Sequence, residues 1–235
     1  MNGIVKKLLC YLILPLLIVL LGWLIVKSVM KPVEFNKQKA AREQVGIQRL
    51  KDIRDLQVAF NSVNGHFAST LDSLKDFYKK GEMAVVMQVG SRDDSLAMAH
   101  TDAIKKTYRK VNEQELNQIL YKLYQQGDKN LVFSVTSKIP VRDTLFNGRT
   151  NFNVDSLDFV PFSGGEKIEM SSIVKTVSGV QVPLFEAKIP YKQLLRGLDN
   201  QLRINLDAER RESDRYEGLQ VGSITSPNNN AGNWE

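Results

Sequence analysis

The residues able to carry acid–base, nucleophilic or metal chemistry are few and scattered along the chain. There are two histidines, His66 and His100, and one cysteine, Cys10. A metal centre needs several converging ligands, and a nucleophile needs a base and a group that orients this base. Two isolated histidines supply neither, and one cysteine forms no intrachain disulfide. The sequence therefore predicts no catalytic residue, no metal site and no cofactor.

Two polar segments remain as candidates for ligand chemistry. Asp93, Asp94 and Asp102 could chelate a hard cation. Calcium takes six to eight oxygens, and the familiar loop spacing is absent, so we expect a solvated polar loop over 90–101. Residues 163–167 (Ser-Gly-Gly-Glu-Lys) lack the spacing of a phosphate-binding loop and are predicted to form a turn between strands.

Residues 8–26 form an uncharged apolar run that follows a short basic tip, residues 1–7. Nineteen residues of helix span about 28 Å, close to the thickness of the hydrocarbon core of a bilayer. A cleaved secretory signal is the alternative. The run is too long for one, and no cleavage site with small residues follows it. We therefore predict an uncleaved, single-pass transmembrane helix.

The net charge of +6 belongs to the anchor and the stem. Residues 1–60 carry all of this excess, whereas residues 61–235 hold 22 basic and 22 acidic side chains. Basic residues beside a bilayer contact anionic headgroups, at about 1 kcal/mol each. A nucleic-acid-binding protein would need a basic face on its folded part. The charge pattern thus predicts the lipid bilayer as a partner and excludes nucleic acid.

The charges on either side of the apolar run indicate two opposite orientations. Lys6 and Lys7 precede it, and five basic residues follow it closely: Lys27, Lys31, Lys37, Lys39 and Arg42. Strict counting by the positive-inside rule puts the head in the cytoplasm. A short basic tip before a first apolar run is typical of an export signal-anchor, which puts the head outside. Our prediction is a bacterial inner-membrane protein with its head in the periplasm.

Residues 27–63 are predicted to form an amphipathic stem helix. Ile47, Leu50, Ile53 and Leu56 recur at steps of three and four, which places them in one apolar stripe. The Asn-Gly pair that follows is typical of a helix end. Such a stripe must pack on its own head or on a partner. Our hypothesis is that these four residues pair with another helix.

The head, residues 64–225, is predicted to have an α+β fold because helical segments come first and strands follow. One short helix covers 71–80 after a Ser-Thr pair, and another begins at 112–115 with the spacing of a capping box. A short helix follows Pro190. Strands are predicted at 83–89, 131–136, 167–177, 180–188 and 213–224.

Two turn-rich segments complete the expected organisation. Ser178-Gly179 lies between two strands rich in β-branched residues, which is a hairpin signal. Residues 226–235 are predicted to form a polar tail. Because burial of a tryptophan outweighs the cost of ordering a tail, we expect Trp234 to dock in a groove of this chain or of a neighbour.

Three features of the first eighty residues are similar to those of a known protein family. An apolar helix runs into an amphipathic stem with Leu-Lys-Asp-Ile-Arg-Asp-Leu-Gln-Val-Ala-Phe at 50–60. Asn-Gly-His-Phe follows at 64–67, and then a short helix with Leu71 and Leu74. In these features the chain resembles the type IV pilin and type II secretion pseudopilin family, in which an antiparallel sheet follows. The terminal Gly-Asn-Trp at 232–234 is similar to the ends of some major pseudopilins.

The amino terminus departs from the pattern of this family. Prepilins have a Gly before an apolar residue at the cleavage point and a Glu five residues into the mature helix. Here Gly3 precedes Ile4, but Leu8 stands at the position of the Glu, and two lysines interrupt the apolar end. The resemblance therefore implies a pilin-like envelope protein without the prepilin cleavage motif.

The leading hypothesis from the sequence is a non-enzymatic structural or assembly component of a bacterial envelope complex. Its partners would be other envelope proteins, reached through the stem helix and the head, or further copies of this chain. The alternative is a membrane-tethered periplasmic domain that binds or senses a ligand, which predicts a closed apolar pocket in the head. An enzyme, the third class, would require the three loop carboxylates to converge.

Overall fold

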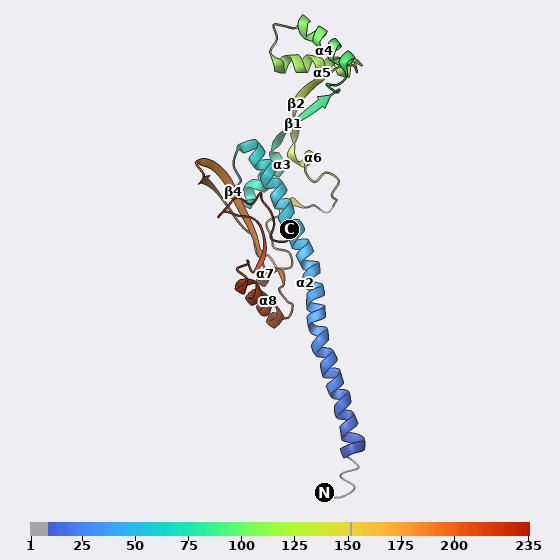
Figure 1. Ribbon diagram of the computed structural model, residues 1–235, viewed down its shortest axis with the longest axis vertical. Helices are drawn as coiled ribbons and strands as arrows, with labels where there is room; N and C mark the ends of the chain where they lie inside the picture. The colour runs from blue at the N-terminus through green and yellow to red at the C-terminus, as the bar shows by residue number, and fades with distance from the viewer. Residues whose placement is uncertain (1–8, 151) are drawn as a thin grey trace.

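A single long helix dominates the computed structural model, which describes residues 9–150 and 152–235 (Figure 1). A π-helical turn, η1 (Leu9–Ile13), leads into α2 (Leu14–Asn64), a helix of 51 residues and about 77 Å. The helix ends where Gly65 adopts a φ of +74° and donates its N–H to the Asn61 carbonyl at 2.8 Å. Anchor and stem therefore form one continuous helix. The expected basic tip lies outside the described residues.

The amino-terminal part of α2 fits a membrane-spanning segment by length and composition. This end of the helix is long and apolar enough to cross a bilayer, and none of its most apolar stretch is buried in the protein. The first buried side chain of the helix is Phe35. The amino-terminal end of the helix is thus apolar and not covered by other parts of the protein, whereas the head covers its carboxyl-terminal end.

A three-stranded antiparallel sheet packs beside the carboxyl-terminal part of α2. Its strands β3 (Glu169–Val177), β4 (Val180–Pro190) and β5 (Gly218–Gly222) lie in the order β3-β4-β5. The predicted hairpin is confirmed: Ser178 and Gly179 connect β3 to β4 with φ values of 50° and 83°. Two positive φ angles give the backbone twist that matches the twist of the paired strands.

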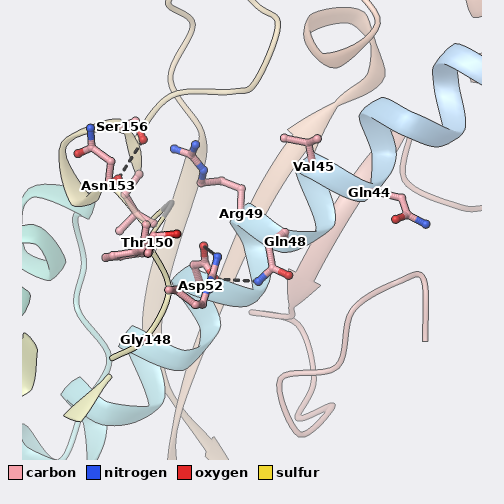
Figure 2. Close-up of a pocket in the computed structure, with 12 residues that line it drawn as sticks. Gln44, Val45, Gln48, Arg49, Asp52, Gly148, Thr150, Asn153 and Ser156 are labelled. Atoms are coloured by element: carbon pink, nitrogen blue, oxygen red, sulfur yellow. Dashed lines mark hydrogen bonds and ion pairs between the residues drawn. The ribbon is translucent and has the colours of Figure 1, made fainter. Parts of the chain in front are cut away.

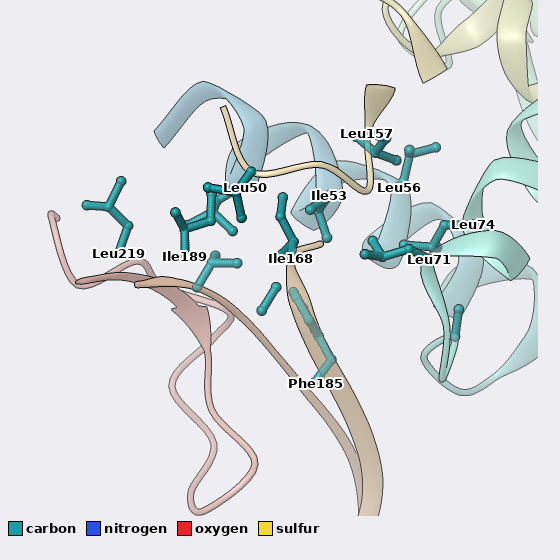
Figure 3. Close-up of a cluster of buried hydrophobic side chains, with 14 of the residues drawn as sticks. Leu50, Ile53, Leu56, Leu71, Leu74, Leu157, Ile168, Phe185, Ile189 and Leu219 are labelled. Atoms are coloured by element: carbon teal, nitrogen blue, oxygen red, sulfur yellow. The ribbon is translucent and has the colours of Figure 1, made fainter. Parts of the chain in front are cut away.

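The main core forms between α2 and this sheet (Figure 3). Leu50, Ile53 and Leu56 of α2 are fully buried, and Phe185 and Ile189 of β4 pack in the same cluster. The helix approaches the sheet closely at Gly46, where an added Cβ would lie 2.8 Å from the Leu219 Cδ1. Other elements close the cluster: α3 (Leu71–Lys80), α6 (Val141–Thr144), α7 (Tyr191–Leu194) and the residues that follow the 3-10 turn η2 (Val154–Ser156).

Residues 82–140 project beyond this core as a separate arm (Figure 1). The arm consists of β1 (Glu82–Val89), α4 (Ser95–Thr107), α5 (Glu113–Gln125) and β2 (Phe133–Pro140). β1 and β2 pair antiparallel as a two-stranded ribbon, and the two helices lie at its far end. A small cluster around Leu120, Leu131 and Phe133 holds the helices to the ribbon. The head is therefore a body with an arm, and its mixture of helices and small antiparallel sheets gives an α+β fold.

Local capping signals identified two of the short helices correctly. The Thr70 Oγ1 accepts the Ser73 N–H at 3.2 Å at the start of α3. The Asn112 Oδ1 accepts the Glu115 N–H at 2.8 Å at the start of α5. Each bond satisfies a donor that the first helical turn leaves free.

The polar loop predicted for residues 90–101 is wrong, because α4 begins inside it. The Asp94 carboxylate accepts the N–H groups of Leu96 and Ala97, both at 3.1 Å, and so caps that helix. A second helix missing from the prediction is α8 (Asn200–Glu212), capped in the same way by Asp199. Aspartate is a favoured N-cap, so both starts were encoded locally.

Residues 226–235 belong to the body and do not form a separate tail. The Gly222 N–H donates to the Ala231 carbonyl at 3.0 Å, and the Asn233 N–H donates to the Gln220 carbonyl at 2.9 Å. These bonds extend the pairing of the sheet along the outer edge of β5, where Gly232 bridges Val221. Backbone groups on a strand edge need partners, and the last residues of the chain supply them.

Candidate functional site

The residues predicted to pair with a partner helix lie in the core of this chain. Leu50, Ile53 and Leu56 are 0 % exposed, and Ile47 packs half-buried against the same cluster. The sheet and the loops of the head cover Leu50, Ile53 and Leu56 completely, which leaves these three residues no surface for a second helix (Figure 3). This burial corrects the pairing hypothesis: the stripe joins the stem to its own head.

Trp234 docks on its own chain. It is partly buried and packs against the main core, and the sheet-like bonds of Asn233 hold it in place. The next residue, Glu235, accepts a bond from the Arg54 Nη1 at 2.6 Å. The end of the chain is thereby fastened to α2 through Glu235 and to β5 through Asn233.

The residues singled out for metal or phosphate chemistry do not converge. The His100 Nε2 lies 2.8 Å from the Asp128 Oδ2, a hydrogen-bond contact that lowers the pKa of Asp128. Asp94 serves as a helix cap. The Ser163 Oγ accepts the Glu166 N–H at 3.0 Å, so that segment is the predicted turn. Within residues 9–150 and 152–235, no group of three histidine, cysteine or acidic residues is placed to hold a metal.

One cavity that brings charged side chains together is a groove beside α2 (Figure 2). It has a volume of about 590 Å³ and lies between α2 and two stretches of the loop before β3, residues 148–150 and 152–157. The helix contributes Gln48, Arg49 and Asp52, and the loop contributes Arg149 and Ser156. Two guanidinium groups and one carboxylate therefore meet in one open groove.

Asp52 is the fixed anion of this groove. Its side chain is buried, with the residue only 4 % exposed. The Arg149 Nη1 and Nη2 donate to its two oxygens at 2.5 and 3.2 Å, and the Gln48 Nε2 donates at 3.0 Å. A bidentate guanidinium–carboxylate pair is among the strongest polar contacts in proteins, and it raises the pKa of Arg149. The pair ties the loop to α2 across 97 positions of sequence.

Arg49 is the less well satisfied cation. Burial lowers the pKa of its guanidinium, and the nearby carboxylates of Asp52 and Asp158 partly offset this effect. Its Nη1 is shielded from solvent, and among the described residues no acceptor lies within hydrogen-bonding distance of it. The groove thus holds one guanidinium that is fully paired and one that is not.

The sequence prediction missed Arg49, Asp52 and Arg149. Asp52 stands within the apolar stripe, next to Ile53, and a buried carboxylate there requires a partner. The sequence could therefore have indicated that Asp52 has a polar partner, but it could not identify that partner as an arginine in a distant loop.

No protein-family model matches this chain, and neither a curated protein nor a solved structure does. Function is therefore inferred from the geometry of its own residues.

Proposed function

We propose that the protein is a single-pass, membrane-anchored, pilin-like structural or assembly component of a bacterial envelope complex, of the secretion or surface-filament type. It acts through contacts with other envelope proteins or with further copies of itself, and not as an enzyme. The observation that carries the proposal is the continuity of α2, whose apolar end fits a bilayer and whose other end is the central element of the head core.

This continuity fixes the head close to the membrane surface. Phe35, the first buried side chain, follows Val26 by nine residues, or about 14 Å of helix. The headgroup region extends roughly 5–8 Å beyond the hydrocarbon core. A head mounted this way has a defined height above the bilayer, which suits a part that positions other proteins.

The arm offers the contact surface that such a part needs. It stands at the end of the molecule opposite the apolar segment (Figure 1). Val86 on its ribbon is 59 % exposed, and Leu96 on α4 is 77 % exposed. A two-stranded ribbon also has two outer edges whose backbone groups can pair with another strand. Exposed apolar side chains beside free strand edges favour a protein partner.

A ligand-sensing domain is the weaker candidate. That hypothesis predicts a closed apolar pocket, whereas the groove beside α2 is lined by guanidinium, carboxylate and amide groups. We therefore favour the assembly role. The periplasmic location of the head is proposed from the short basic tip before the apolar run.

The test combines membrane topology with partner capture in intact cells. Protease added to spheroplasts should remove the carboxyl terminus, and a photo-crosslinking residue at Leu96 should give a discrete adduct. The matched control is the same group at Asn205, an exposed position on α8. If the carboxyl terminus is protected from protease until the cells are lysed, the head lies in the cytoplasm and the proposed orientation is wrong. Indiscriminate or absent adducts from the arm would refute the assembly role.

A further inference from the structure

The groove beside α2 carries an unmatched positive charge. Arg149 is neutralised by Asp52, whose two oxygens already accept three hydrogen bonds from it and from Gln48. Arg49, on the same wall, has no such carboxylate of its own within the described residues. A buried, charged donor without an acceptor is costly, and the protein retains it here beside an open cavity.

The remaining nearby anion forms ion pairs through one of its oxygens, and its Oδ1 has no hydrogen-bond partner among the described residues. Asp158 is buried, and its Oδ2 lies 3.2 Å from the Lys75 Nζ and 3.7 Å from the Lys167 Nζ. It is close enough to act electrostatically on Arg49, but it forms no ion pair with that guanidinium among the described residues. The carboxylates near Arg49 on α2 and in the loop therefore form no ion pair with it, and its Nη1, which is shielded from solvent, has no acceptor among the described residues.

The shape and charge of the groove indicate the class of group that fits. A planar carboxylate matches one guanidinium edge and carries a single negative charge. A phosphate dianion would bring a second charge toward Asp52 and Asp158. A single bound water needs far less room than a cavity of about 590 Å³, and Gln44 and Ser156 lie on the lining to orient a larger group.

We propose that this groove binds a carboxylate of a partner protein, an acidic side chain or a chain terminus, which pairs with Arg49. The partner being a protein rests on the proposed function. The chemistry of the site, a guanidinium that donates hydrogen bonds to one carboxylate, does not depend on the proposed function.

The experiment uses the full chain in detergent micelles and follows the Nε–Hε signals of its arginines by NMR. The probe is glutamate capped at both backbone ends, and its matched partner is the equally capped glutamine, at constant ionic strength. We expect a saturable shift of the Arg49 signal with the glutamate probe and binding at least ten-fold weaker with the glutamine probe. A charge-assisted bond accounts for a factor of this size.

Substitutions locate the site. Arg49→Gln should weaken binding of the glutamate probe about ten-fold, whereas Arg142→Gln, an exposed arginine outside the groove, should leave it unchanged. If the Arg49→Gln chain fails to fold, the comparison of the two probes on the unsubstituted chain decides the question. Equal affinity for both probes overturns the proposal, and so does tighter binding of inorganic phosphate than of the glutamate probe.

Failure of this site and failure of the proposed function give different results. If the probe binds but no partner is captured, the carboxylate site is supported and the assembly role is refuted. If a partner is captured but the glutamate and glutamine probes bind equally well, the assembly role is supported and the carboxylate site is refuted.

Discussion

Shortening Leu50 should destabilise the head strongly. Leu50 is 0 % exposed and lies between α2 and the sheet, so Leu50→Ala removes buried methyl groups and leaves a cavity. Substitutions of this kind cost about 2.7–5 kcal/mol in the free energy of unfolding. For a domain of this size, each kcal/mol lowers Tm by roughly 2–4 °C, so the expected loss is about 5–20 °C. The measurement is thermal unfolding of the full chain in detergent, followed by near-ultraviolet circular dichroism.

The control lies on the same helix. Val58 is exposed, and Val58→Ala should change the free energy of unfolding by less than about 0.5 kcal/mol. The competing explanation, in which the stripe binds a partner helix, predicts the opposite pattern for Leu50→Ala: an unchanged Tm of the isolated chain and loss of the complex. That pattern would refute the reasoning from burial.

Two further predictions concern polar contacts. Arg149→Ala leaves the buried Asp52 carboxylate with Gln48 as its only hydrogen-bond partner among the described residues. Denaturant titration should show a free energy of unfolding lower by roughly 1–3 kcal/mol. This range is smaller than for a fully buried pair because Arg149 itself is partly exposed. A double variant with Asp52→Asn should recover part of this loss, and a larger loss in the double variant would contradict the pairing. The bond from Arg54 lowers the pKa of Glu235 in the folded protein. A depressed carboxyl pKa stabilises the folded state above the unfolded pKa, and this contribution is lost as the pH falls through the folded pKa. The protection of the Gly232–Glu235 turn against hydrogen exchange, taken relative to the intrinsic rate at each pH, should therefore fall on acidification below about pH 4.5. Glu235→Gln should show low protection already at pH 7; identical pH profiles of protection for the two proteins would exclude this role.

Features that depend on neighbouring residues were predictable from the sequence. The anchor follows from the thickness of a bilayer and the length of an uncharged run. The caps at Thr70 and Asn112 and the hairpin turn at Ser178-Gly179 each depend on a few consecutive residues. The α4 and α8 helices were missed although Asp94 and Asp199 mark their starts, because the apolar positions that follow each cap are too few to reveal a helical period.

The candidate site was not predictable in the same way. Asp52 and Arg149 are 97 positions apart, and only the folded loop brings the guanidinium to the carboxylate. The tail also needed the tertiary structure, since its hydrogen bonds exist only along the edge of β5.

The sequence by itself determined that this protein has a membrane-length apolar helix, an amphipathic stem and a mixed helical and sheet head. Periodicity showed which side of the stem must be covered, because a face of leucine and isoleucine cannot remain in water. It could not show what covers that face, since a partner helix and a folded-back sheet satisfy the same apolar stripe equally well. Only the tertiary structure decided that question, by placing the sheet of the same chain against Leu50, Ile53 and Leu56.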